Sequence, residues 1–145
     1  MRRLSAYYVF PVSSAPLPFG IIETADDGTI IRIIDTGGNL KESSRLEFYQ
    51  GILVPGIVFD AAEPRGPAEV CKYILGVQKS NTTLSLNEIL RSLTLNAAKR
   101  IALDGSIGSL EKGKNPGIML IDDVDLENMK LTEESTLKVL IVTGS

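Results

Sequence analysis

One stretch of the sequence, from Ser85 to Asp122, constrains the fold more than any other. Ser85 suits the N-cap of a helix, and Glu88 stands three residues later, which is the spacing of a capping box. Apolar residues then recur at steps of three and four, so they lie along one side of a helix; they are Leu86, Ile89, Leu90, Leu93, Ala97 and Ile101. The pattern predicts one helix that begins after Ser85 and ends before Gly105.

A glycine-rich loop and a buried strand follow this helix. Glycines recur between Gly105 and Gly117, and Pro116 precedes the last of them. Ile118–Ile121 is a short, continuous apolar run, which suits a strand covered on both faces. The glycines do not lie between a strand and a helix N-terminus, as a phosphate-binding loop requires, so we expect them to form turns.

The N-terminal part of the chain reads as short strands separated by turns. Asp26-Asp27-Gly28 is a strong turn signal between two apolar runs, so the strands on either side of it should pair as a hairpin. Prolines in residues 11–18 favour a loop there. The expected strands are Leu4–Phe10, Ile21–Thr24, Ile30–Asp35, Arg45–Tyr49 and Gly51–Val58.

The remaining segments complete an α+β pattern. A polar connector, Asp60–Pro67, leads into a helix that begins at Pro67. Asp122–Asp125 is expected to be an acidic loop, residues 126–135 carry few signals, and Leu137–Val142 is expected to be the last strand. Strands precede and follow the helices, so we predict a small, mostly antiparallel β-sandwich or sheet built from both chain ends, with two helices inserted. Residues 1–145 should form one domain, with strands in 4–60 and 106–145 and the helical insertion in 67–103.

Composition excludes several kinds of chemistry. The 145 residues contain no histidine and one cysteine, so Ser-His and Cys-His pairs, His-containing zinc sites and internal disulfides are all impossible. The net charge of −3 gives no electrostatic case for nucleic acid. No apolar run is long enough to cross a bilayer or to act as an export signal, so we expect a cytoplasmic protein without membrane or cofactor.

Few side chains are candidates for a functional site, and each has a simpler structural interpretation. Cys71 would be a reactive thiol, but lone cysteines are often buried in helices. Asp60 and Glu63 would be a carboxylate pair for acid–base chemistry, but a polar linker explains them more simply. The acidic residues of the predicted loop would bind a cation, but they lack the spacing of a calcium loop; these are Asp122, Asp123 and Asp125.

Aromatic residues in the N-terminal strands are the last candidates. They would form a platform for a ligand, although packing in a core or at an interface is the simpler expectation; they are Tyr7, Tyr8, Phe10, Phe48 and Tyr49. We therefore assign no catalytic, cofactor-binding or metal-binding residue from the sequence.

Three segments together resemble the amidohydrolase superfamily of metal-dependent hydrolases, in particular its cytosine-deaminase and chlorohydrolase-like branch. Residues 51–58, GILVPGIV, are similar to the segment that leads from the family's β-domain into its barrel. Residues 84–99 are similar to the helix that closes the barrel, and residues 107–122 to the return into the β-domain. The resemblance implies a composite β-domain and, for the family, hydrolysis assisted by a metal ion.

The chain departs from this family where the chemistry should lie. The family's His-x-His metal motif should follow residues 51–58, but Phe59-Asp60-Ala61-Ala62 stands there. A (β/α)₈ barrel needs on the order of 250 residues, and only residues 59–83 separate the family-like segments. We therefore expect a barrel-less, non-catalytic domain that binds no metal and self-associates through surface that the barrel would cover. The alternative is a hydrolase of C–N or C–Cl bonds whose barrel is supplied separately.

Overall fold

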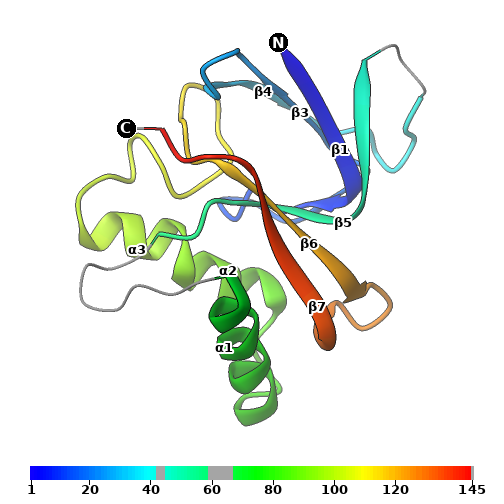
Figure 1. Ribbon diagram of the computed structural model, residues 1–145, viewed down its shortest axis with the longest axis vertical. Coiled ribbons are helices and arrows are strands. Elements are labelled where there is room, and N and C mark those ends of the chain that lie inside the picture. The colour runs from blue at the N-terminus through cyan, green and yellow to red at the C-terminus, as the bar shows by residue number, and fades with distance from the viewer. Residues whose placement is uncertain (42–44, 59–66, 145) are drawn as a thin grey trace.

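The computed structural model describes residues 1–41, 45–58 and 67–144. These residues form an α+β fold, which confirms the predicted class (Figure 1). In chain order the elements are β1 (Arg2–Val9), β2 (Leu17–Pro18), β3 (Ile21–Thr24), β4 (Ile30–Ile34), β5 (Leu46–Pro55), α1 (Pro67–Ser80), α2 (Leu86–Leu93), α3 (Leu95–Arg100), β6 (Ile118–Asp125) and β7 (Lys130–Ile141).

All of the strands belong to one sheet of seven strands, in the order β4-β3-β1-β5-β6-β7, with β2 beside the end of β1. The β1–β5 pair is parallel and the other pairs are antiparallel. Strands that precede and follow the helices meet where β5 pairs with β6, from Ile52 opposite Ile121 to Pro55 opposite Ile118. The helices gather beside β7, away from β3 and β4 (Figure 1).

The sheet curls, so its β4 edge meets the segment that precedes β6. The backbone N–H of Ile30 donates to the Lys114 carbonyl at 2.9 Å, and the N–H of Gly113 donates to the Ile30 carbonyl at 2.8 Å. Nearby, the Asn115 side chain donates to the Asp27 carbonyl at 3.0 Å. The glycine-rich loop thus satisfies backbone groups of an edge strand that would otherwise be open.

Two hydrophobic cores lie on the two faces of this sheet. The first is formed between the sheet and the helices. The second fills the inside of the curl. Successive residues of β5 and β6 alternate between the two cores, as the pleat of a strand requires: Ile52, Val54, Met119 and Ile121 belong to the first, and Leu53, Ile118 and Leu120 to the second.

The predicted helix after Ser85 is two helices rather than one. Ser85 is the N-cap, as expected, and its hydroxyl accepts a hydrogen bond from the Glu88 N–H at 3.1 Å. The helix breaks at Thr94, whose φ of −123° and ψ of −87° are not helical and whose hydroxyl donates to the Leu90 carbonyl at 2.7 Å. This local hydrogen bond competes with the helical geometry. Ile101 follows the second helix and is exposed, so its predicted place on the buried stripe is wrong.

The strand predictions need three corrections. The strands predicted at Arg45–Tyr49 and Gly51–Val58 are joined in one continuous strand, β5, which begins at Leu46 and ends at Pro55. Asp122–Asp125 lies within β6 instead of forming a loop, and β7 begins at Lys130 instead of Leu137. Sequence alone does not show the extensions of β6 and β7 because the polar residues in them are paired with the neighbouring strand. The predicted loop over residues 11–18 also contains a short strand, Leu17–Pro18, which pairs with the end of β1.

Other expectations are confirmed. The strands on either side of Asp26-Asp27-Gly28 pair as an antiparallel hairpin, with Ile21 opposite Ile34. The first helix begins at Pro67. None of the helices in the described part of the chain is long and apolar enough to cross a membrane.

Two glycine-to-alanine changes should have opposite effects on stability. At Gly51, an added methyl group would fall on the Ile121 carbonyl oxygen, well inside van der Waals contact, so we expect Gly51→Ala to destabilise the fold by about 1–3 kcal/mol. At Gly76, in α1, an added methyl group meets nothing, and Gly76→Ala should stabilise the fold by up to about 1 kcal/mol. Urea denaturation measures both changes; equal effects would contradict the packing at Gly51.

Candidate functional site

A pocket of about 440 Å³ opens where β1, β5 and β6 are irregular. Residues 50–51 of β5 lie beside Tyr7 at a shift in register, and a second shift falls between Asp122 and Val124 of β6. Bulges of this kind redirect side chains and are common beside active sites. Two carboxylates and one aromatic ring therefore share one concavity, whose full lining is Tyr7, Gln50, Gly51, Leu120, Asp122, Asp123, Val124 and Leu126.

An aromatic patch, which we define as Tyr7, Phe19 and Phe48, adjoins this pocket through Tyr7. The Tyr7 and Phe48 ring centroids are 5.5 Å apart at an angle of 77°, and the Tyr7 and Phe19 centroids are 6.1 Å apart at 86°. Phe19 and Phe48 are nearly parallel, at 6.1 Å. The Phe48 side chain is 40% exposed, so this edge-to-face cluster lies at the surface.

The other predicted aromatic candidates are not part of the patch. Phe10 is fully buried in the core between the sheet and the helices, and Tyr8 packs against the same core. Tyr49 donates to Glu47, as described below. The structure thus divides the predicted platform between a core, a polar network and a surface cluster.

Two of the three acidic candidates have carboxylates that accept local hydrogen bonds, and the third is exposed. Asp122 accepts hydrogen bonds from the backbone N–H and the hydroxyl of Thr136 on β7. The Asp125 carboxylate accepts from the N–H and the side-chain amide of Asn128, and these bonds lower the pKa of Asp125. Asp123 is exposed at the bulge. The three carboxylates do not converge as cation ligands would.

Cys71 lies on α1 and is buried in the core between the sheet and the helices. Burial, together with the negative charge of Asp122, raises the pKa of the Cys71 thiol. A thiol with a raised pKa is a poor nucleophile at neutral pH. The residue is therefore placed to fill space rather than to react. The other sequence candidates, Asp60 and Glu63, lie outside the described residues.

A buried carboxylate, Glu23, lies between two arginines of the neighbouring strands. Glu23 on β3 is 4% exposed and pairs with Arg32 on β4 and with Arg3 on β1, the latter at 2.8 Å. The hydrogen bond from Arg32, followed by that from Arg3, lowers the pKa of Glu23. Removing one partner of a buried ion pair destabilises the fold because the other charge is left buried and unpaired. The three charged side chains therefore stabilise this end of the sheet together.

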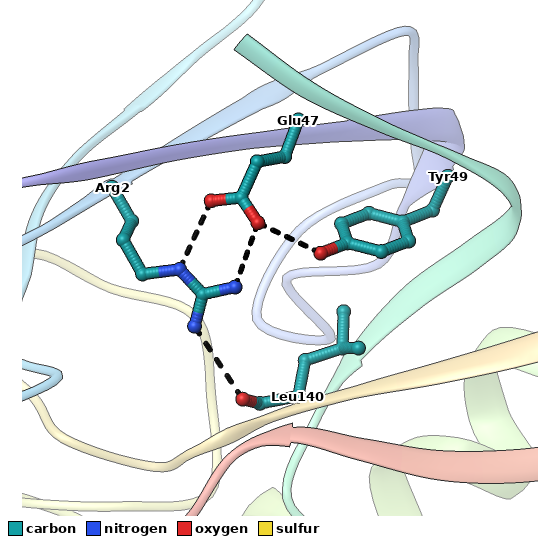
Figure 2. Close-up of polar contacts among 4 residues, drawn as sticks. All are labelled: Arg2, Glu47, Tyr49 and Leu140. Atoms are coloured by element: carbon teal, nitrogen blue, oxygen red, sulfur yellow. Dashed lines mark hydrogen bonds and ion pairs between the residues drawn. The ribbon is translucent and has the colours of Figure 1, made fainter. Parts of the chain in front are cut away.

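A second ion pair joins β1 to β5. The Arg2 guanidinium donates to both oxygens of Glu47, at 3.0 and 2.8 Å, and the Tyr49 hydroxyl donates to the same carboxylate at 2.9 Å (Figure 2). Arg2 also reaches the Leu140 carbonyl of β7 at 3.5 Å, across the curl of the sheet. The hydrogen bond from Arg2 lowers the pKa of Glu47. The group fixes the positions of β1, β5 and β7 relative to one another.

Ser109 and Lys114 form a pair that could be mistaken for a nucleophile and its base. The Lys114 ammonium donates to the Ser109 hydroxyl at 2.7 Å, and that hydroxyl donates to Glu111 at 2.6 Å. Ser109 is fully buried. A nucleophilic serine needs an effective base and a path for substrate. The hydrogen bonds from Ser109 and Lys114 lower the pKa of Glu111, which makes this carboxylate a weak base, and the burial of Ser109 leaves no path for substrate. The pair instead fixes the loop that closes the curl.

A pocket of about 480 Å³ lies at the start of α2 and has a largely apolar lining that includes Phe10, Leu86 and Met129. Several polar groups in its lining form hydrogen bonds within the protein. The Gln78 amide donates to the Leu131 carbonyl at 3.1 Å and accepts from the Leu131 N–H at 2.9 Å. The Ser85 hydroxyl caps α2. No convergent polar set that would orient a reacting group is present in the described lining.

The residues do not fit a zinc site of the kind that the family resemblance implies. Such a site needs histidine, cysteine or carboxylate ligands at close range, and the whole sequence contains no histidine. Within 1–41, 45–58 and 67–144, no three His, Cys, Asp or Glu side chains lie close enough together to hold a metal ion. The described part of the chain therefore offers no ligand set for metal-assisted hydrolysis.

Comparison with known proteins gives partial matches to hydrolases. No protein-family model matches the chain. The imidazolonepropionase of Thermoanaerobacter pseudethanolicus is 39% identical over 61 residues, and that of Caldanaerobacter subterraneus subsp. tengcongensis is 36% identical over 63 residues. These matches cover 42% and 43% of this chain but only 15% of each relative. Over that part, they point to the amidohydrolase superfamily, in agreement with the resemblance in the sequence.

Solved structures give weaker similarities. N-acetyl-D-glucosamine-6-phosphate deacetylase from Mycobacterium smegmatis has a TM-score of 0.31 at 22% identity, over 40% of this chain and 14% of that one. An adenosine deaminase from Xanthomonas campestris with bound zinc has a TM-score of 0.30 at 17% identity, over 68% and 31%. Ochratoxinase from A. niger has a TM-score of 0.30 at 14% identity, over 79% and 31%. Scores this low do not establish a shared fold.

Sequence reasoning missed one member of the aromatic patch and the shape of the pocket. Phe19 follows the prolines of a predicted loop, and no periodicity shows that it reaches Tyr7 and Phe48. Gly51, which stands between the two strands predicted at Arg45–Tyr49 and Gly51–Val58, was the available signal for the pocket, because a glycine inside a strand often marks a bulge or a close backbone approach.

The buried Glu23 should make stability depend on acid. The pKa of Glu23 is lower in the folded protein than the ordinary glutamate value, which is about 4.3. The charged carboxylate therefore stabilises the fold at pH values above this ordinary value. The contribution is lost as the pH falls through the lower pKa of the folded state. Glu23→Gln should be less stable than the parent chain at pH 7, with the difference shrinking in acid. Urea denaturation across pH measures it. The exposed Glu134→Gln is the control, and a pH-independent difference for Glu23→Gln would contradict this role of the charge.

Proposed function

We propose that this chain is a non-catalytic, barrel-less relative of the amidohydrolase-type hydrolases, of the cytosine-deaminase or chlorohydrolase-like kind, which acts as a folded structural or interaction domain. The partial matches to imidazolonepropionases support the relation to hydrolases. The assignment as non-catalytic, and the finer branch, are our inference from the side chains of the chain itself.

One observation carries this proposal. Strand β5 ends at Pro55 and helix α1 begins at Pro67, and both elements pack on one core. The resemblance places a (β/α)₈ barrel, which requires on the order of 250 residues, between segments 51–58 and 84–99, where this chain has only residues 59–83. In a barrel enzyme the active site is built from loops at one end of the barrel strands. A chain that is too short to form the barrel strands retains the supporting β-domain but lacks the active site of the barrel.

The chemistry of the remaining side chains agrees with this interpretation. The Asp122 carboxylate accepts hydrogen bonds from the backbone N–H and hydroxyl of Thr136, and the Asp125 carboxylate accepts from the backbone N–H and side-chain amide of Asn128. The single thiol is buried, and Ser109 is fully buried beside Glu111, a carboxylate whose pKa is lowered by the hydrogen bond from Ser109. General acid–base, nucleophilic and metal-assisted catalysis each need a group that is accessible and held at the required protonation state.

The alternative is a hydrolase of C–N or C–Cl bonds, acting on a small heterocyclic or amidine substrate when another polypeptide supplies the barrel. The relation of the matched segment to hydrolases favours this possibility. It predicts that the isolated chain gains activity only with that second polypeptide. Hydrolysis of cytosine-like or amidine substrates by the chain alone, abolished by Asp60→Asn, would overturn the non-catalytic proposal.

Metal analysis of the purified protein tests the main proposal. We expect far less than one zinc ion per chain after incubation with zinc and removal of the excess, because the side chains do not supply a tetrahedral ligand set. Elemental analysis by mass spectrometry gives the ratio. About one zinc per chain, reduced in Asp122→Asn but not in the exposed control Glu134→Gln, would contradict the proposal.

A further inference from the structure

We infer that helix α1 is a cover that keeps the edge of β7 from pairing with β7 of a second copy, and that Gln78 is the residue that closes this edge. A strand at the edge of a sheet presents unpaired backbone N–H and C=O groups, which another chain can use as a template for strand pairing. A contact that blocks such pairing is autoinhibitory. Because α1 covers this edge whether or not the chain is catalytic, the inference goes beyond the proposed function.

The two ends of the sheet are closed in different ways. At the β4 end, the backbone N–H and C=O of Ile30 are bonded to Lys114 and Gly113. At the other end, β7 pairs with β6 alone within the described residues. With 12 residues, β7 is also the longest of the described strands. An edge of this length needs a cover if the chain is to stay unpaired.

The Gln78 side chain takes the place of a neighbouring strand at Leu131. Its amide donates to the Leu131 carbonyl at 3.1 Å and accepts a hydrogen bond from the Leu131 N–H at 2.9 Å. In an antiparallel pair, opposite residues exchange these same two bonds. A glutamine amide carries both the donor and the acceptor that this exchange requires. Gln78 therefore satisfies the groups that a strand from another chain would bind.

The rest of α1 continues this cover along β7, beside which the helices gather (Figure 1). Apolar residues of α1 and β7 belong to the core between the sheet and the helices; they are Val70, Cys71, Ile74, Leu131 and Leu137. Near the C-terminal end of α1, the Lys79 ammonium lies 3.6 Å from the Glu133 carboxylate of β7, and both side chains are exposed. A strand that paired along Leu131 would have to displace this end of α1.

The contact between α1 and β7 is loosely packed, so it can be opened. A pocket of about 360 Å³ lies between them, and its lining includes Cys71 and Leu75 of α1 and Ser135 of β7. An exposed ion pair such as Lys79–Glu133 contributes little to stability. Gly76 lowers the helix propensity of α1. The two hydrogen bonds of Gln78 are therefore the part of the cover that decides whether the edge is closed.

A second copy of β7 is the strand that fits the uncovered edge. A two-fold axis at Thr136 pairs β7 with its own copy in antiparallel order, so the edges of both copies are satisfied at once. Glu134 and Lys138 lie two residues on either side of Thr136, and all three side chains are exposed. In this register, Glu134 of each copy stands opposite Lys138 of the other, which gives two ion pairs across the strands. The charges of β7 thus complement themselves.

Gln78→Met in the whole chain tests the cover, because methionine keeps the length and helix propensity of glutamine but removes both bonds to Leu131. At a concentration where the variant is monomeric, we expect the Leu131 amide to exchange with solvent about tenfold faster than in the parent chain. At higher concentration, sedimentation equilibrium should show association about tenfold tighter than any association of the parent. Gln50→Met, at the exposed glutamine of β5, is the matched control and should change neither quantity. An unaltered Gln78→Met, or equal effects of the two changes, would overturn the inference.

The pairing of β7 with itself is tested in the Gln78→Met background, after urea denaturation has shown that the variant folds. Adding Glu134→Lys should weaken the association several-fold, because like charges then stand opposite each other, and adding Lys138→Glu as well should restore it. A reversed charge pair that restores nothing would overturn the inference. If Gln78→Met does not fold, Gln78→Glu takes its place with the same order of effects, because it keeps an acceptor for the Leu131 N–H. None of these outcomes depends on the zinc measurement.

Discussion

The pairing of β5 with β6 is the interaction on which the rest of the structure depends. It joins strands that are separated in sequence by all three helices, with Leu53 opposite Leu120 and Val54 opposite Met119. Alternate residues of these two strands supply both hydrophobic cores, so losing this pair would open the inside of the curl and the layer under the helices together. The helices are held in place by the same pair, because they pack on the face that it presents.

This dependence explains how a domain can persist without a barrel. By the family resemblance, the barrel would leave the sheet at the end of β5 and return through the helices to β6. Because β5 and β6 pair directly, the sheet closes whether many residues or few lie between them, and loop-closure entropy rises only slowly with loop length. By the same resemblance, the domain that would support a catalytic site is thus independent of the residues that would perform catalysis.

Sequence patterns predicted the fold class, the first hairpin and the buried β6 run, since each follows from local periodicity or turn chemistry. They failed where tertiary contacts override local preference. Thr94 breaks a helix whose apolar spacing continues past it, because its hydroxyl binds the Leu90 carbonyl. Asp122 stays in a strand because Thr136 satisfies its carboxylate. The patch formed by Phe19 and its neighbours depends on the return of a loop, which no single segment encodes.

Native-state amide hydrogen exchange on the metal-free protein tests the central claim most directly. If the β5–β6 pair holds the domain together without a barrel or a bound metal, amides of Ile52–Val54 and Met119–Ile121 should exchange most slowly of all, with the free energy of global unfolding. Fast exchange in both segments, slowed only when zinc or a second polypeptide is added, would contradict that claim.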